Sequence, residues 1–168
     1  METIHLSYVK DGKFISGSPE KNKLLYIIDI GGLLKNNPSF ELYQKLSTLT
    51  SLWIDSAPRR FEDVMDIVIV GASRVTIRKG VFRDDVSRVF REIEIDLYEG
   101  IDNVEQCDEP IGDWKGRIIY IPHELGFKER EKLALAASKV PLYLVLRERN
   151  FIDIEWAENV GIKGVIYE

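Results

Sequence analysis

Two stretches of the sequence share one pattern and decide the fold: RRFEDVMDIVIVGASRVTI, starting at Arg59, and RNFIDIEWAENVGIKGVIY, starting at Arg149. Each begins with an arginine, continues with a helical pattern, turns at a glycine and ends in an apolar run typical of a strand. The offset between them is 90 residues. Similar segments at a fixed offset indicate an internal repeat, so we expect a chain built from two similar halves.

The repeat extends beyond these two stretches. An offset of 88 residues aligns YVKDG at Tyr8 with DLYEG at Asp96, and an offset of 91 aligns IIDIG at Ile27 with IIYIP at Ile118. The alternative is that generic strand–helix units resemble one another by chance. Three matches in the same order and at nearly constant offset favour a duplication, with halves of about 1–83 and 84–168 in a single domain.

Short apolar runs with the length of β-strands recur along the whole chain. Several are apolar at consecutive positions, which is typical of parallel strands covered on both faces. Eight such runs are present: IHLSYV at Ile4, LLYIIDI at Leu24, LWID at Leu52, RVTI at Arg74, EIEIDL at Glu92, RIIYIP at Arg117, PLYLVL at Pro141 and GVIY at Gly164.

Helical patterns occupy only some of the gaps between these runs. The clearest begins at Asn37, a predicted N-cap, with Pro38 at the first helical position. Four more are predicted at about 61–70, 84–90, 128–139 and 152–160, whereas 11–23 and 98–116 read as loops. Eight strands with five helices predict an α/β fold, a compact (β/α)₈ TIM barrel that lacks at least three outer helices.

Composition excludes several classes of function. A chain of 168 residues that is 45% hydrophobic can bury one core, and its net charge of −5 argues against a nucleic-acid surface. The single cysteine, Cys107, and His5 have no partners that suggest a metal, so we expect neither a metal nor a cofactor. The polar N-terminus and short apolar runs predict no signal segment and no membrane segment, and hence a cytoplasmic location.

With these motifs the chain resembles the HisA/HisF family, whose barrels are duplicated halves. SYVKDGKF at Ser7 is similar to the family's first strand, YIIDIGG at Tyr26 to its second, and the stretch at Arg59 to its Arg-Ser-x-Glu-Asp-Val helix and the strand that follows. WIDSAPR at Trp53 is similar to an archaeal group of uncharacterised HisA-related proteins. The resemblance covers nearly the whole chain and implies a ribulose-phosphate-binding type of barrel.

The resemblance also implies a reaction. The family's isomerase, an intramolecular oxidoreductase of histidine biosynthesis, performs an Amadori-type aldose–ketose rearrangement with aspartates at the ends of the first and fifth strands. Proton transfer needs such an acid–base pair. Asp96 falls on the fifth-strand aspartate, whereas the first-strand position is Tyr8, a phenol with an ordinary pKa near ~10. The resemblance thus points to Asp96 and the Tyr8 position as the catalytic pair. His123, the only histidine at the carboxyl end of a predicted strand, is the alternative counterpart of Asp96.

The phosphate-binding loops differ from those of the family, which grips phosphates with glycine-rich loops after the third and seventh strands. Here these loops read DSAPRR at Asp55 and LRERN at Leu146, whose side chains would block the backbone approach. Arginines can replace the lost amides, or they can simply neutralise the rim aspartates. The candidate substrate-binding residues are Asp29, Asp55, Arg59, Arg78, Arg147 and Arg149.

Two functions remain open: a sugar-phosphate or ribotide isomerase-like enzyme with a rebuilt site, and a catalytically inactive barrel that acts as a binding or assembly module. Asp96, on the same predicted strand face as Glu94, can be a proton-transfer group or an ion-pair partner, and His123 can be incidental. The expected ligand is a small phosphorylated or anionic molecule. Strands without outer helices would expose apolar faces near the first, fifth and eighth strands, so we also expect a homo-oligomer.

Overall fold

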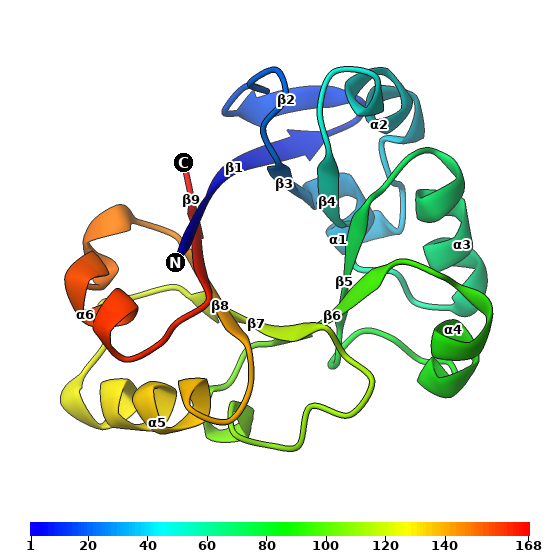
Figure 1. Ribbon diagram of the computed structural model, residues 1–168. Helices are drawn as coiled ribbons and strands as arrows, with labels where there is room; N and C mark the ends of the chain where they lie inside the picture. Colours follow the sequence, from blue (N-terminus) through cyan, green and yellow to red (C-terminus); the bar gives the residue numbers. More distant parts are fainter. The chain divides into compact units, whose positions relative to one another are not determined.

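The computed structural model describes residues 1–168 and has the predicted barrel fold. Eight parallel strands follow one another in chain order, and β1 also pairs with β9, which closes the sheet (Figure 1). The short β2 is antiparallel to β1. The strands are β1 (Glu2–Lys10), β2 (Lys13–Ser16), β3 (Leu25–Asp29), β4 (Leu52–Asp55), β5 (Arg74–Arg78), β6 (Asp96–Ile101), β7 (Gly116–Ile121), β8 (Leu142–Leu146) and β9 (Gly164–Tyr167).

Six α-helices accompany the eight barrel strands, so the barrel is compact, as predicted. The connections from β1 to β3 and from β6 to β7 contain no α-helix. All five predicted helices are present, and α1 is an additional one. The helices are α1 (Ile30–Lys35), α2 (Phe40–Ser47), α3 (Phe61–Ile69), α4 (Val86–Glu92), α5 (Phe127–Ala137) and α6 (Ile154–Asn159), with single 3₁₀ turns η1 (Val104–Gln106) and η2 (Arg149–Phe151).

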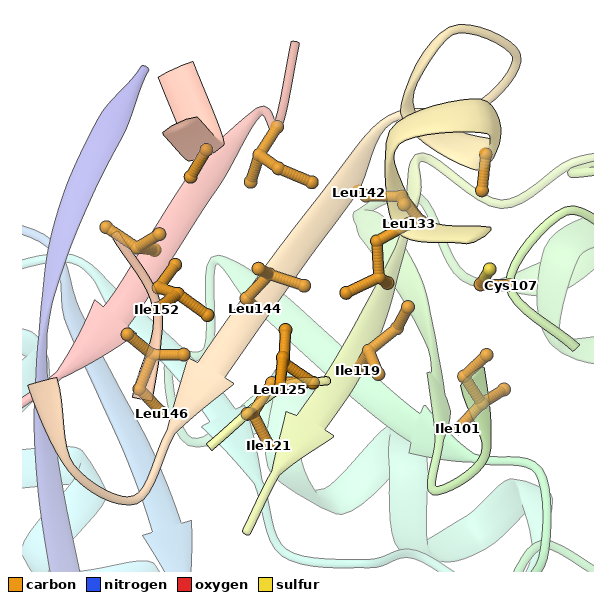
Figure 2. Packing of buried hydrophobic residues seen from close by; sticks show 14 of the residues in the cluster. Ile101, Cys107, Ile119, Ile121, Leu125, Leu133, Leu142, Leu144, Leu146 and Ile152 are labelled. Atoms are coloured by element: carbon orange, nitrogen blue, oxygen red, sulfur yellow. The ribbon is translucent and has the colours of Figure 1, made fainter. Parts of the chain in front are cut away.

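The chain divides into two compact units. One contains His5–Leu97, and the other contains Met1–Ile4 with Tyr98–Glu168. In the first unit α3 packs against β5 and α4. In the second, α5 and α6 cover β7 to β9 through a cluster of buried aliphatic side chains that includes Ile119, Leu133, Leu144 and Val165 (Figure 2). Single-domain organisation, with a repeat boundary near residue 83, stays a prediction.

The start of α2 differs from its prediction. The predicted N-cap at Asn37 is wrong, because α2 begins at Phe40 with Ser39 as its N-cap. The cause is Asp29, whose carboxylate accepts hydrogen bonds from the N–H groups of Ser39 (2.7 Å) and Gly32 (3.1 Å). One buried side chain therefore fixes the starts of both α1 and α2.

The fifth barrel strand also lies elsewhere than predicted. The apolar alternation of EIEIDL predicted a strand over 92–97, but α4 continues to Glu92 and β6 begins only at Asp96. Ile93 ends α4, with its N–H donated to the carbonyl of Val89 (2.9 Å), and Glu94 is exposed in the connection. The alternation belonged to a helix end and a short connection rather than to a strand.

The segment 11–23, predicted as a loop, contains β2. Asp11 (φ 51°) and Gly12 (φ 74°) both have left-handed backbone, as the tight turn of a β-hairpin requires. At Gly17 an added Cβ would lie 2.4 Å from Ser7 Oγ, so the segment after β2 lies directly on the outer side of β1. The hairpin thus covers β1 where an outer helix is missing, and Val9 is fully buried.

A buried arginine holds the long connection between β6 and β7. Arg117 is only 1% exposed, and its Nε donates to Glu99 Oε1 (2.8 Å). Its Nη1 donates to the carbonyls of Cys107 (2.9 Å) and Glu109 (2.7 Å), so the loop is tied to β7.

The expectation that strands without outer helices expose apolar faces is wrong: Val9 of β1, Ile101 of β6 and Val165 of β9 are buried within the chain. Self-association itself stays a prediction.

Candidate functional site

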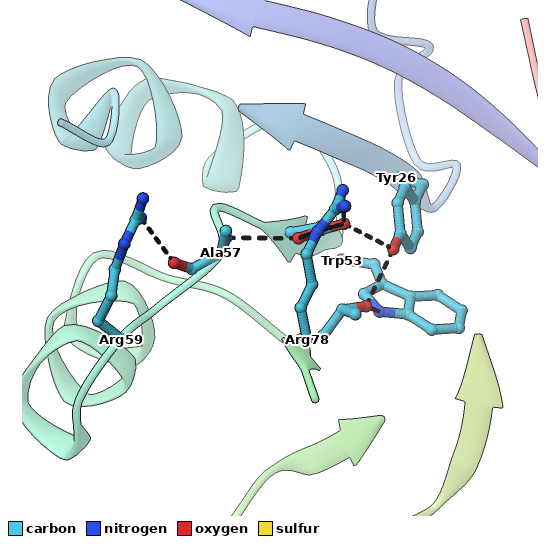
Figure 3. A network of polar contacts seen from close by, with 7 residues as sticks. Tyr26, Trp53, Ala57, Arg59 and Arg78 are labelled. Carbon is cyan, nitrogen blue, oxygen red and sulfur yellow. Dashed lines mark hydrogen bonds and ion pairs between the residues drawn. The ribbon is translucent and has the colours of Figure 1, made fainter. Parts of the chain in front are cut away.

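Polar side chains of β3, β4 and β5 meet on one face of the sheet in the unit His5–Leu97 (Figure 3). Asp55 is the last residue of β4 and Arg78 the last residue of β5. Arg78 Nε lies 3.0 Å from Asp55 Oδ1, and its Nη2 lies 2.8 Å from Oδ2, with side-chain exposures of 12% and 0%. The carboxyl ends of these strands therefore hold a bidentate, largely buried ion pair.

A chain of hydrogen bonds leads to the same carboxylate. Trp53 Nε1 donates to Thr76 Oγ1 (2.9 Å), Thr76 Oγ1 lies 3.0 Å from the Tyr26 hydroxyl, and that hydroxyl donates to Asp55 Oδ2 (3.4 Å). Because an indole N–H only donates and an ionised carboxylate only accepts, Thr76 donates to Tyr26 and both hydroxyl protons point toward Asp55. The chain thus adds to the stabilisation of the Asp55 charge.

The loop after β4 is fixed by Arg59. Its guanidinium donates to the carbonyls of Ala57 (2.8 Å) and Leu33 (2.7 Å), and also to that of Gly32. Ala57 has left-handed backbone (φ 52°), and its N–H donates to Asp55 Oδ1 (3.3 Å). A non-glycine residue in this conformation costs on the order of 1 kcal/mol, which these contacts offset. Arg59 therefore shapes the loop and closes the end of α1.

Cationic side chains gather at the loops that follow β4 and β5. The two loops are joined by a hydrogen bond from Arg83 N to the carbonyl of Arg59 (2.8 Å). Besides Arg78 they carry the exposed side chains of Arg60, Lys79 and Arg83. The nearby Asp84 accepts from the backbone N–H of Phe61 (3.0 Å), and this bond lowers the pKa of Asp84. The same loops also contain Asp84 and Asp85, and the first turn of α3 adds Glu62 and Asp63, so this edge holds basic and acidic side chains together.

Asp29, a predicted binding residue, lies inside the strand–helix layer. It is fully buried and accepts hydrogen bonds from the Tyr43 hydroxyl and from two backbone N–H groups. Burial, together with the neighbouring Asp29, raises the pKa of Tyr43 far above its usual value. These contacts account for Asp29 as the residue that positions α1 and α2.

The predicted catalytic residues of this unit do not share one edge of the sheet. Tyr8 lies near the carboxyl end of β1, in register with Ile28 of β3, and is half-buried. Asp96 is exposed and is the first residue of β6, so the prediction that it ends the fifth strand is wrong. In a parallel sheet this places Asp96 at the edge opposite to the one that carries Asp55. The cause is the misplaced strand described above.

Three further predicted residues lie in the unit that contains Tyr98–Glu168. His123, Arg147 and Arg149 follow β7 and β8 and are exposed. His123 Nε2 lies 3.4 Å from Glu129 Oε1, and the Arg149 guanidinium lies 5.6 Å from the centre of the Tyr167 ring. These contacts are local, and none of them forms a buried cluster.

Sequence reasoning missed Tyr26, Trp53 and Thr76 as members of the site. The signal was present in the strand period, because every second residue of β4 and β5 faces the same side, as Trp53 and Asp55 do.

No three His, Cys, Asp or Glu side chains lie close enough together to hold a metal ion. None of the helices combines the length and the apolar character needed to cross a bilayer.

Comparison with known proteins identifies the class of protein. The chain resembles the X-ray crystal structure of the YdjI aldolase from Escherichia coli K12 with a TM-score of 0.59 and 14% sequence identity, covering 99% of this chain and 75% of that one. At this identity the likeness shows the fold, and the protein is a TIM-barrel protein. No protein-family profile and no curated protein matches the sequence.

Proposed function

We propose that this chain is a HisA-related barrel that binds a small phosphorylated or other anionic ligand at the carboxyl ends of β4 and β5, as a binding module rather than an isomerase. The kinship rests on the motifs at Ser7, Tyr26 and Arg59. One observation carries the proposal: Arg78, held by the buried Asp55, lies beside two joined loops with exposed cations.

The position and the chemistry of this edge both favour an anion. TIM barrels bind their ligands at the carboxyl ends of the strands, where Arg78 and its loops lie. Arginine recognises phosphate through paired N–H groups, and a guanidinium already fixed by a carboxylate loses less conformational entropy on binding.

The same geometry argues against the family's isomerisation. That reaction needs two groups that exchange protons with one substrate. Asp96 begins β6 instead of ending it, and both oxygens of Asp55 already accept hydrogen bonds from Arg78. The arrangement of Asp55, Arg78 and Asp96 therefore supports binding of a ligand better than it supports proton transfer to or from one.

Calorimetric titration with inorganic phosphate and with ribose 5-phosphate tests the proposal. The double variant Arg60→Gln/Lys79→Gln should lower affinity by roughly tenfold or more, since a hydrogen bond to a charged group contributes about 1.5–3 kcal/mol. Lys139→Gln, which removes an exposed cation beyond the end of α5, is the matched control and should bind like wild type. No binding by wild type, or equal losses in both variants, would contradict the proposal.

The second candidate is an isomerase-like enzyme, and the position of Asp55 as the last residue of β4 favours it, because barrel enzymes hold their catalytic groups at the carboxyl ends of strands. In this candidate Asp55 replaces Asp96 as the proton-exchanging group, after Arg78 has moved onto the ligand. Such an enzyme would exchange the carbon 2 proton of a sugar phosphate with deuterium in D₂O, detectable by NMR. Asp55→Asn should abolish the exchange, and no exchange by wild type would reject this candidate.

A further inference from the structure

The turn between β1 and β2 contains the only Asp–Gly pair of the sequence, Asp11–Gly12. Both residues are exposed, and both have positive φ, 51° and 74°. An added Cβ at Gly12 would meet nothing within 4 Å. The glycine side of this peptide bond therefore faces open space.

An aspartate followed by glycine can rearrange without an enzyme. The backbone nitrogen of the glycine bonds to the carboxyl carbon of the aspartate side chain; the nitrogen loses its proton, the carboxyl group loses a hydroxyl, and the two leave as water. Water then opens the cyclic succinimide at either carbonyl carbon, which gives aspartate or isoaspartate. Glycine favours the attack because it has no side chain to obstruct it.

A second pair with a small following residue, Asp55–Ser56, has the opposite surroundings. Both of its residues are only 1% exposed. The Asp55 carboxylate is held by Arg78 at 3.0 and 2.8 Å, so it cannot turn toward the backbone nitrogen of Ser56. The fold thus protects this pair and leaves Asp11–Gly12 open.

The turn also has room for the product and a contact to lose. Asp11 and Gly12 line a pocket of about 400 Å³ together with the residues at the start of α2. The N–H of Gly12 donates to Oγ of Ser39, the N-cap residue of α2, at 2.9 Å. A succinimide nitrogen has no proton to donate, so ring formation breaks this bond between the hairpin and α2.

We propose that Asp11–Gly12 is a modification site at which aspartate converts to isoaspartate and releases the β1–β2 hairpin from Ser39. Isoaspartate carries the main chain through its side-chain carbon, which lengthens the turn and removes the tight geometry that the hairpin requires. The site is separate from the proposed anion site, because neither Asp11 nor Ser39 belongs to the loops after β4 and β5.

Peptide mapping of wild-type protein after several weeks at physiological temperature tests the proposal. The peptide with position 11 should separate into two species of equal mass, and endoproteinase Asp-N should no longer cut the new species after Lys10. The peptide with Asp55 should remain a single species. In concentrated urea, where the chain is unfolded, the Asp55 peptide should also convert.

The variant Asp11→Asn keeps a turn sequence that suits the hairpin and should convert faster, because a side-chain amide reacts without first taking up a proton. Once converted, it should unfold at a lower temperature than the fresh variant. A single Asp11 species in incubated wild type would overturn the proposal. So would equal conversion at Asp11 and Asp55 in the folded protein, and an unchanged unfolding temperature would reject the release of the hairpin.

Discussion

The two halves of the chain contain segments, aligned at an offset of 90 residues, that have the same backbone pattern but opposite chemistry on one strand face. In β4–α3–β5 and in β8–α6–β9 the helix ends at a glycine with positive φ, Gly71 (113°) and Gly161 (90°). Trp53 and Tyr143 lie 90 residues apart, and both are buried. Their neighbours differ at three aligned pairs: Asp55 and Val145, Arg74 and Gly164, and Thr76 and Ile166.

This difference separates what the fold requires from what a site requires. Trp53 has the Arg74 guanidinium 5.2 Å from its ring centre and donates its N–H to Thr76. Tyr143 instead packs over Gly164 and edge-on against Tyr98, with ring centres 5.5 Å apart. Helix-facing aliphatic residues and turn glycines are common to both halves, so they build the barrel. The polar face remains only in the first half, and we place the function there.

The largest effect is expected when Asp55 is replaced by the residue of the other half. Asp55→Val leaves the mostly buried Arg78 without its carboxylate. Breaking a buried ion pair from one side costs about 3–5 kcal/mol of the free energy of unfolding. Urea denaturation followed by circular dichroism measures the loss.

The double variant Asp55→Val/Arg78→Met is the control for this prediction. When both members of a buried pair become apolar, stability is often unchanged or higher, so most of the loss should be recovered. Phosphate binding should be lost in the single and the double variant alike. A double variant as unstable as the single one would show that the ion pair is not the source of the effect.

The next effect concerns the second half. Gly164→Ala would place a Cβ 2.7 Å from Tyr143 Cδ1, and the aromatic ring is held by its packing against Tyr98. Overpacking of this kind costs about 1–3 kcal/mol of the free energy of unfolding. Gly80→Ala is the matched control, because nothing lies within 4 Å of a Cβ there. Equal stability of the two variants would mean that Gly164 is not needed to seat Tyr143.

How far the sequence predicts this structure also differs between its parts. Apolar period and glycine turns suffice for five of the six α-helices and for seven of the eight barrel strands, because burial of one face determines them. The duplication stays a prediction. The prediction for the fifth barrel strand was wrong, because the apolar alternation of EIEIDL is typical of a strand but lies in the end of α4 and the connection after it. The contacts of Arg117 with loop carbonyls could not be predicted from the sequence, because every residue has a backbone carbonyl and no residue type marks the acceptor. Asp55 and Arg78 were found from their place at strand ends, whereas the donor chain through Thr76 depends on register between strands.

The buried contact between Asp29 and Tyr43 gives the first half a pH dependence that the aligned position of the second half, Tyr120, does not share. Burial raises the folded-state pKa of Tyr43 above its ordinary value of 10.0. The folded state therefore holds this proton more tightly, and the contribution of Tyr43 to stability is constant below that pH. Above it, stability should fall by up to about 1.4 kcal/mol per pH unit for this one proton.

Urea denaturation at alkaline pH measures this slope, with Tyr43→Phe as the comparison. At alkaline pH the stability of Tyr43→Phe should fall less steeply than that of wild type, by up to about 1.4 kcal/mol per pH unit. It should also be less stable than wild type at neutral pH, because the Asp29 carboxylate loses its hydroxyl donor. An unchanged alkaline slope in Tyr43→Phe would assign the pH dependence to other groups.

The smallest effect tests whether the polar face of the first half acts as one network. Trp53→Phe removes the N–H that Thr76 accepts at 2.9 Å, and Thr76→Val removes the acceptor and the link to Tyr26. A neutral hydrogen bond contributes about 1 kcal/mol, so the double variant should be more stable than the sum of single losses by about that amount. A coupling near zero would make Trp53 and Tyr143 equivalent core residues. The two halves would then differ only at the Asp55–Arg78 pair, and the site would shrink to that pair and its loops.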